Sequence, residues 1–226
     1  VARALGSGAR VTGIDVAEPM LAAAARAHAE TEPGGGGATV DFLLGDAQTH
    51  PFAPERFDLI VSRCGVMFFA DPVAAFANLR AATTNGGGLR FVAWRSAEEN
   101  PFMTTAERAA RPLLGPDRLP LRDPDAPGQF AFANADILRG VLGDAGWADV
   151  ELRALDTPCA FPEAQLLPYV TRVGPLANAL RAVDDDATRA RVLDAVREAF
   201  APFVHDGEVR FTARMWDVGA TNASQR

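Results

Sequence analysis

Two acidic residues have the type and the position to bind the sugar and the base of a nucleotide. Asp15 ends the short run 10–15, which is rich in β-branched residues, and a helix-forming segment follows it directly. In an open α/β sheet, ligands bind beyond the carboxyl ends of the strands, and an acid at that place typically accepts both hydroxyls of a ribose. Aspartate is also a favoured helix cap, so a capping role for Asp15 stays open.

Asp46 repeats this arrangement at the end of the next apolar run, 38–47. Together with a backbone amide beside the small residue Ala47, its carboxylate could bind the exocyclic amine of an adenine. By itself Asp46 is better explained as a loop-capping residue. The two acids together indicate one nucleoside pocket more strongly than either does alone.

Strands that alternate with helices must position these acids, and the fold class that this order predicts is α/β with a doubly wound, Rossmann-like sheet. The runs 38–47 and 57–64 are almost continuously apolar, which is typical of parallel strands covered on both faces. The first part of the chain is expected to contain strands at 10–15, 38–47, 57–64 and 89–95, and helices at 18–30 and 71–83.

After residue 95 the regular alternation of predicted strands and helices ends, and prolines and scattered aromatic residues replace it. We expect a lid-like insertion at 96–133, with one helix near 101–114, and a helical C-terminal region at 163–205. The whole chain, 1–226, is interpreted as a single domain. The remaining expected elements are a helix at 134–145, a strand at 148–156, helices near 163–182 and 186–202, and a final edge strand at 208–220.

Charge and composition exclude several classes of function. The net charge is −7, and the 22 basic residues are all arginine, so the chain has no amine for a Schiff base and no P-loop lysine. An acidic chain argues against a nucleic-acid partner. Cys64 and Cys159 have no metal or disulfide spacing, so no metal is expected. The sequence shows neither a membrane span nor a signal segment, so we expect a cytoplasmic protein. The sequence does not predict the oligomeric state.

Five segments, taken in order, resemble successive motifs of the class I S-adenosylmethionine-dependent methyltransferases, in particular the small-molecule enzymes of the ubiquinone-biosynthesis type. The resemblance covers roughly residues 1–160. The segments are VTGIDVAEPML, GDAQTHPF, FDLIVSRCGVMFFADP, NGGGLRFVAWR and PGQFAFANADILRGVLGDAGWADVEL.

The resemblance implies S-adenosyl-L-methionine as the cofactor and a small molecule as the methyl acceptor. Asp15 would hold the ribose hydroxyls, Asp46 and Ala47 would bind the adenine, and the cofactor would also contact Val16, Met20, Arg63 and Cys64. Transfer by in-line displacement depends mostly on positioning and desolvation, so no catalytic residue is named; His50 is the one histidine worth testing. The acceptor pocket is expected to use Met67, Phe69, Trp94, Phe102, Met103 and Phe132, with a plain core role as the alternative, above all for Phe68 and Trp94.

The chain departs from the family pattern at its start. A glycine-rich turn should lie 15 to 20 residues before the ribose acid, but only 14 residues precede Asp15. The glycines Gly6 and Gly8 are too close and are expected to form a turn between a helix and a strand. We therefore expect the first strand of the fold to be missing, which leaves 10–15 and 57–62 without a common neighbour and weakens cofactor binding. A nicotinamide-dependent oxidoreductase and a non-catalytic remnant remain as alternatives.

Overall fold

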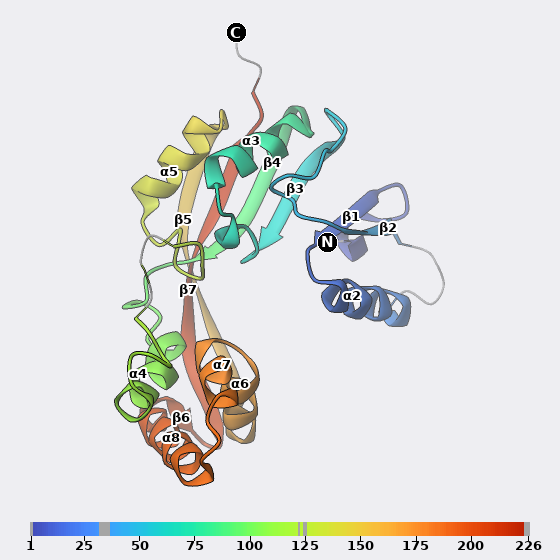
Figure 1. Cartoon of the computed structure of the whole chain (residues 1–226). Coiled ribbons are helices and arrows are strands. Elements are labelled where there is room, and N and C mark those ends of the chain that lie inside the picture. The colour runs from blue at the N-terminus through green and yellow to red at the C-terminus, as the bar shows by residue number, and fades with distance from the viewer. Residues whose placement is uncertain (1, 32–36, 122, 124–125, 224–226) are drawn as a thin grey trace.

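Within residues 2–31, 37–121, 123 and 126–223, which the computed structural model describes, the strands form two separate sheets (Figure 1). The first contains only β1 and β2, which are parallel. The second has the order β3-β4-β7-β5, with the short β6 paired to β7. This mixture of helices and strands is the predicted α/β class.

The first sheet belongs to a β-α-β unit at the start of the chain. It is built from α1 (Ala2–Leu5), β1 (Arg10–Asp15), α2 (Glu18–Thr31) and β2 (Thr39–Leu44). Gly6, with φ of 71°, and Gly8 lie in the predicted turn between α1 and β1, which confirms that they do not form a strand-to-helix turn. Val1 lies outside the described residues.

The second sheet combines one parallel pair, β3 (Phe57–Arg63) with β4 (Thr83–Trp94), and two antiparallel pairs, in which β7 (Glu208–Thr221) lies between β4 and β5 (Ala148–Pro162). The prediction that 208–220 is an edge strand was therefore wrong. An antiparallel strand shows the same alternation of side chains at an edge and in the interior, so the pattern could not distinguish the two.

Strand β4 starts six residues earlier than expected and takes in the glycines at positions 86–88. The pairing with β3 jumps between Phe57 and Leu59, which marks a bulge. At Gly87 a Cβ atom would come within 2.7 Å of the Thr83 and Thr84 side chains and 2.9 Å of the Asp58 carbonyl oxygen. The backbones approach so closely there that only glycine fits.

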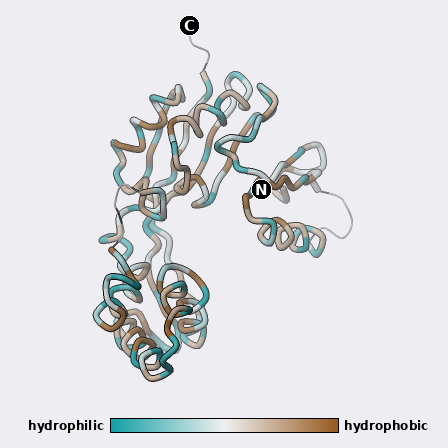
Figure 2. The backbone as a smooth tube through the Cα atoms, viewed as in Figure 1, coloured by the Kyte–Doolittle hydropathy of each residue, from teal (hydrophilic) through white to brown (hydrophobic). Residues whose placement is uncertain are grey.

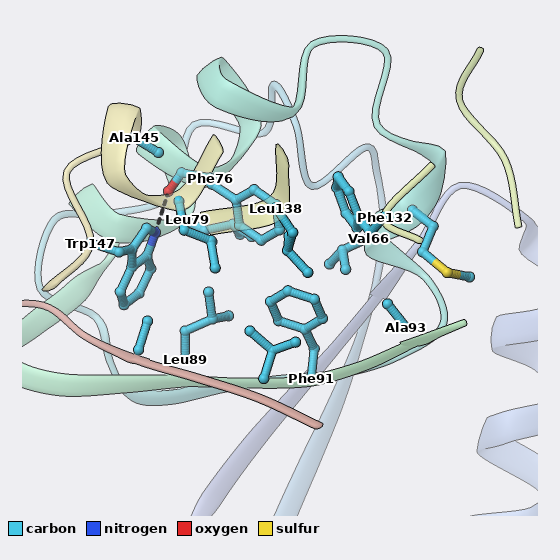
Figure 3. Close-up of a cluster of buried hydrophobic side chains, with 14 residues drawn as sticks. Val66, Phe76, Leu79, Leu89, Phe91, Ala93, Phe132, Leu138, Ala145 and Trp147 are labelled. Atoms are coloured by element: carbon cyan, nitrogen blue, oxygen red, sulfur yellow. Dashed lines mark hydrogen bonds between the residues drawn. The ribbon is translucent and has the colours of Figure 1, made fainter. Parts of the chain in front are cut away.

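One face of the second sheet is covered by α3 (Pro72–Ala81) and α5 (Ala135–Asp144), which lie in front of it in Figure 1. Side chains from both helices and from β4 form the first core (Figure 3). Phe76 stacks on Phe91 with ring centroids 5.6 Å apart, and Trp147 donates a hydrogen bond of 3.0 Å to the Phe76 carbonyl oxygen. Asp71 caps α3, as its Asp-Pro start predicts, through a hydrogen bond from Ala74.

A second core lies in a helical lobe around the far ends of β5 and β7. Along its helices, hydrophobic and hydrophilic residues alternate, which is typical of helices with one buried face (Figure 2). The lobe contains α4 (Phe102–Leu114), η2 (Glu163–Gln165), α6 (Leu166–Arg172), α7 (Pro175–Arg181), α8 (Asp186–Ala199), η3 (Ala201–Phe203) and β6 (Val204–His205); η1 (Val66–Phe68) follows β3 instead.

The helix expected at 163–182 is broken into η2, α6 and α7. Gly174 has φ of 89°, and Pro175 begins α7 at its first turn. The residue before a proline disfavours helical backbone, and here glycine takes a conformation that ends one helix and starts the next at a new angle. The helix near 101–114 is confirmed as α4, and that at 186–202 ends earlier, at Ala199.

The side chain of Asn100 stabilises the junction between the second sheet and the helical lobe through hydrogen bonds. Its side chain is fully buried, and its Nδ2 donates to the carbonyl oxygens of Arg95, Ser96 and Arg214 at 3.4, 3.1 and 2.9 Å. Its Oδ1 accepts a hydrogen bond of 2.9 Å from the Arg214 backbone N–H. One amide therefore joins the segment after β4 to the middle of β7.

An ionic cluster surrounds the same junction. Arg95 pairs with Glu99 and with Asp156, the latter at 2.8 Å, and its guanidinium lies 5.2 Å from the ring centre of Trp216. The hydrogen bond from Arg95 lowers the pKa of Glu99, and the desolvation of Glu99 opposes this shift only in part. The ionised form of Glu99 is thus stabilised in the folded protein.

We expect Glu99→Gln to remove part of the acid sensitivity of folding. A depressed carboxyl pKa adds stability above the unfolded-state value of about 4.5 and loses it as the pH falls through the lower folded value. Urea unfolding from roughly pH 6 to pH 3 should show a shallower fall in the variant, by up to about 1 kcal/mol. Exposed Glu98, replaced by Gln, is the control; equal curves for both variants would contradict the assignment.

The first sheet differs from the rest of the chain in having almost no buried side chains. Among the described residues before Val66, Ala38 alone is buried. Leu44 and Leu59, on β2 and β3, remain 55% and 52% exposed, so the prediction that these two strands are covered on both faces was wrong. None of the described helices is long and apolar enough to span a membrane.

Candidate functional site

Asp15 and Asp46 come together at the carboxyl ends of β1 and β2. The backbone N–H of Gly45 donates a hydrogen bond of 3.0 Å to the Asp15 carbonyl oxygen, which continues the pairing one residue beyond the strands. Oδ1 of Asp15 accepts 2.8 Å from the Ala17 N–H, at the start of α2. No described residue donates to its Oδ2. Asp15 therefore acts as a cap through one oxygen and has the other available for a ligand hydroxyl.

Asp46 is held by a residue that the sequence analysis missed. Gln48 donates its backbone N–H to Oδ1 of Asp46 at 2.9 Å, and its Nε2 lies 3.2 and 3.1 Å from the two carboxylate oxygens. The Gln48 Oε1 accepts a hydrogen bond of 2.6 Å from Ala70, in the segment that follows β3. The backbone N–H of Gln48 on the Asp46 carboxylate forms an Asx turn, which Asp46 alone could signal, whereas nothing in the sequence signalled the contact of the Gln48 side chain.

Asn78 attaches the rest of this loop to α3. Its Nδ2 donates to the carbonyl oxygens of Ala47 and His50, both at 3.1 Å. The His50 ring packs against Phe52, with centroids 4.6 Å apart. No described residue accepts the Ala47 N–H, so it is available to a ligand. The loop between β2 and β3 is thus fixed to α3 with its first residues near the carboxyl end of β3.

Arg63 and Cys64 mark that carboxyl end. Cys64 has φ of 58°, a left-handed conformation that is strained for any residue other than glycine, and its N–H donates 3.0 Å to Val92. Burial raises the pKa of the Cys64 thiol, against a smaller opposite effect of the Arg63 charge. The thiol therefore stays protonated near neutral pH, which favours a packing role over a nucleophilic one. Arg63 is exposed.

Val16 and Met20, which closely follow Asp15 in the sequence, and Leu44, its pairing partner on β2, have exposed side chains, and so has Val61 on β3 of the other sheet. This is apolar surface that a nucleoside could cover. However, β1 pairs with β2 alone and β3 with β4 alone, so within the described residues no strand joins the two sheets. Asp15 and Asp46, which are predicted to bind the nucleoside, lie near each other, but no described strand connects them to Arg63 and Cys64.

The structure corrects part of the expected acceptor pocket. Met67 and Phe132 are 1% and 3% exposed and belong to the first core, so they are packing residues. Phe69 packs edge-on against Phe76, with centroids 5.6 Å apart. Phe68, for which a core role was the main alternative, is exposed. Met67 and Phe68 lie on the short helix η1 and Phe69 directly follows it, and the sequence does not show which of these three side chains face the core.

Three of the expected acceptor residues extend from β4 into the helical lobe. The rings of Trp94 and Phe102 lie 6.1 Å apart, and Phe102 and Met103 line a cavity between α4, α6 and α7. The cavity also uses Tyr169 and Val173, which sequence reasoning missed because nothing in their spacing links α6 to α4. Trp94 is partly buried against the first core.

Comparison with known proteins identifies the kind of domain. A family model described as a methyltransferase domain matches residues 1–91. An uncharacterized protein of Mycobacterium tuberculosis, Rv1405c, is 28% identical over 204 residues, which are 89% of this chain and 70% of that protein. The demethylmenaquinone methyltransferase of Renibacterium salmoninarum is 29% identical over 123 residues, 52% of each chain.

A solved structure of a SAM-dependent methyltransferase from Methanosarcina mazei has the same fold, with a TM-score of 0.53 and 14% identity over 96% of this chain and 83% of that one. Together with the domain match, it confirms the resemblance to the class I methyltransferases and their Rossmann-like fold. The domain match supports S-adenosylmethionine as the cofactor.

Proposed function

We propose that this chain transfers a methyl group from S-adenosylmethionine to a small molecule. The observation that carries the proposal is the meeting of Asp15 and Asp46 at adjacent strand ends, inside the segment that matches a methyltransferase domain. When bound, the cofactor supplies an electrophilic methyl group on a sulfonium sulfur. A fold alone would not define the reaction, because one fold supports many chemistries.

The residues present suit the nucleoside end of that cofactor. The open Oδ2 of Asp15 can accept from ribose hydroxyls, and the unused N–H of Ala47 can donate to the adenine. Both oxygens of Asp46 already accept from Gln48, so any bond to the adenine amine must be shared with it. Val16 and Met20 would pack on the base and exclude water. The acceptor atom attacks the methyl carbon while the carbon–sulfur bond breaks, which needs alignment more than a side-chain base.

The gap between β1 and β3 supports a finer proposal, that residues 1–226 alone bind the cofactor weakly. The methionine end would have to reach Arg63 and Cys64 across two strand edges that do not pair with each other. Between the two halves of the site, the hydrogen bonds described above are those of Gln48 and Asn78, and ligand binding would have to supply the rest of the ordering.

Isothermal calorimetry with S-adenosylhomocysteine, and separately with NAD as the ligand of the alternative function, tests both the proposed methyl transfer and the proposed weak binding. We expect weak binding of S-adenosylhomocysteine and none of NAD. Micromolar affinity for S-adenosylhomocysteine would refute the finer proposal and support the general one, whereas a preference for NAD would replace methyl transfer by the oxidoreductase alternative. If the coding DNA upstream of Val1 supplies a strand and a glycine-rich turn, the extended polypeptide should bind about tenfold tighter or better.

A further inference from the structure

Gln48 uses both ends of its side-chain amide to join two parts of the chain. Its Nε2 lies 3.2 and 3.1 Å from the two carboxylate oxygens of Asp46, and its Oε1 accepts hydrogen bonds of 2.6 and 3.4 Å from the backbone N–H groups of Ala70 and Asp71. The partners determine the orientation of the amide, because its NH₂ group can only donate and its oxygen can only accept. Gln48 thus connects Asp46, after β2, with the residues that precede α3.

The loop that carries Gln48 is held by further hydrogen bonds of its backbone. The Gln48 N–H donates 2.9 Å to Oδ1 of Asp46, and the Asp46 carbonyl oxygen accepts from Thr49 and His50 at 3.1 and 2.8 Å. Asn78 holds the same loop from α3 through two backbone carbonyl oxygens. The backbone of the loop and the carboxylate of Asp46 are therefore held by different side chains.

The contact with Gln48 prepares the Asp46 carboxylate for a ligand. Asp46 is partly exposed, and a carboxylate without partners would have to be ordered on binding, at a cost in free energy. Among the described residues, the Gln48 Nε2 is the one donor to Oδ2 of Asp46. Since a carboxylate oxygen can accept about two hydrogen bonds, Oδ2 can still accept one from the 6-amino group of an adenine.

The other end of the Gln48 amide holds the segment that follows β3. Ala70 and Asp71 lie shortly after Cys64, which marks the carboxyl end of that strand, and Asp71 caps α3. The methionine end of the cofactor is predicted to lie at Arg63 and Cys64. Gln48 therefore connects the acid predicted to bind the adenine with the segment that begins at the predicted methionine end.

We infer that Gln48 is a positioning residue: it orients the Asp46 carboxylate toward the 6-amino group of adenine and holds it in place relative to the segment after β3. The use of Asp46 for adenine rests on the proposed methyl transfer. The link from Asp46 through Gln48 to Ala70 does not rest on it. The contribution of Gln48 is to the selection of the adenine base and not to the transfer of the methyl group.

Amide hydrogen exchange at Ala70, followed by NMR, tests the link without any ligand. Asp46→Ala removes the carboxylate that orients Gln48 and should speed exchange at Ala70 about fivefold, although the hydrogen bond of the Ala70 N–H goes to Gln48. In a Gln48→Met background the same substitution should add nothing, because the connecting amide is already gone. An unchanged rate in Asp46→Ala, or an equal acceleration with and without Gln48, would overturn the link.

Two ligands that differ only in the amine test the role of Gln48 at the adenine. Calorimetry compares S-adenosylhomocysteine with its analogue that has hydrogen in place of the 6-amino group. Gln48→Met should weaken S-adenosylhomocysteine about fivefold and leave the analogue nearly unchanged, since the analogue has no amine for Asp46 to bind. Asn78→Ala loosens the same loop at its backbone and should weaken both ligands by the same factor. Gln165→Met, at an exposed position of the helical lobe, should change neither.

Equal weakening of the two ligands by Gln48→Met would mean that Gln48 only supports the loop, and the positioning role would be rejected. If neither ligand binds to the unmodified chain or to an extended polypeptide, the proposed methyl transfer fails, and the role at the adenine fails with it. Exchange at Ala70 still decides in that case whether Gln48 links Asp46 to the segment after β3.

Discussion

Asn100→Ala should lower the free energy of unfolding by about 2 to 4 kcal/mol. At a fully buried site, the substitution removes the acceptor of the Arg214 N–H and one donor from each of three carbonyl groups. The midpoint of urea unfolding measures the loss. An aspartate at this position should be worse still at neutral pH, because a carboxylate oxygen would face the carbonyl oxygens of Arg95 and Ser96.

Asn178→Ala is the matched control. Asn178 is an exposed residue on α7 that pairs only with Arg181, so its loss should cost less than about 1 kcal/mol. If both alanine variants unfolded at the same urea concentration, Asn100 would not be the residue that stabilises the junction between the second sheet and the helical lobe.

Asp15→Asn should weaken the binding of S-adenosylhomocysteine by about 1 to 3 kcal/mol, roughly five- to 150-fold. Asparagine keeps an oxygen for the Ala17 N–H and is as good a cap, so the start of α2 should be preserved while the negative charge is lost. Calorimetry should use whichever polypeptide, residues 1–226 or an extended one, binds the cofactor more tightly.

Asp41→Asn, on the neighbouring strand β2, changes the same kind of residue at an exposed place and should leave the affinity unchanged. Unchanged affinity in Asp15→Asn, with the parent protein binding well, would show that the ribose does not lie at Asp15. A parallel melting curve distinguishes this from a folding defect, since the variant should melt within a few degrees of the parent.

Local signals in the sequence predicted most elements of the fold. Asp71 before Pro72 is a capping signal with a short-range cause, and this cap forms as expected. Asn134 caps 135–144 in the same way, although its capping role was not predicted. The strands at 10–15 and 57–64 were also predicted, the first from its β-branched residues and the second from its apolar content. What failed were long-range properties: the place of β7 between β4 and β5, and the length of β5, which runs to Pro162. No local pattern records which strand lies beside another.

The residues of the candidate site were likewise predicted where the signal was local and missed where the contact was long-range. Asp15 and Asp46 were found because each follows its own strand, and the structure puts them side by side. Gln48 and Asn78 were missed because their partners, Ala70 and Ala47, lie 22 and 31 residues away. Met67 and Phe69 are two positions apart on one helical turn, so only the packed structure shows that the first is core and the second lies half-buried against Phe76.

Strands β5 and β7 have a mechanical consequence for the molecule. Their pairing is antiparallel from Ala148 with Thr221 to Pro162 with Glu208, so the same two strands run through the sheet and on into the helical lobe. The two lobes are therefore joined by a twisted ribbon in place of a flexible linker. Neither lobe can melt without fraying a strand that the other also needs, so the two cores should be lost in a single cooperative transition on heating.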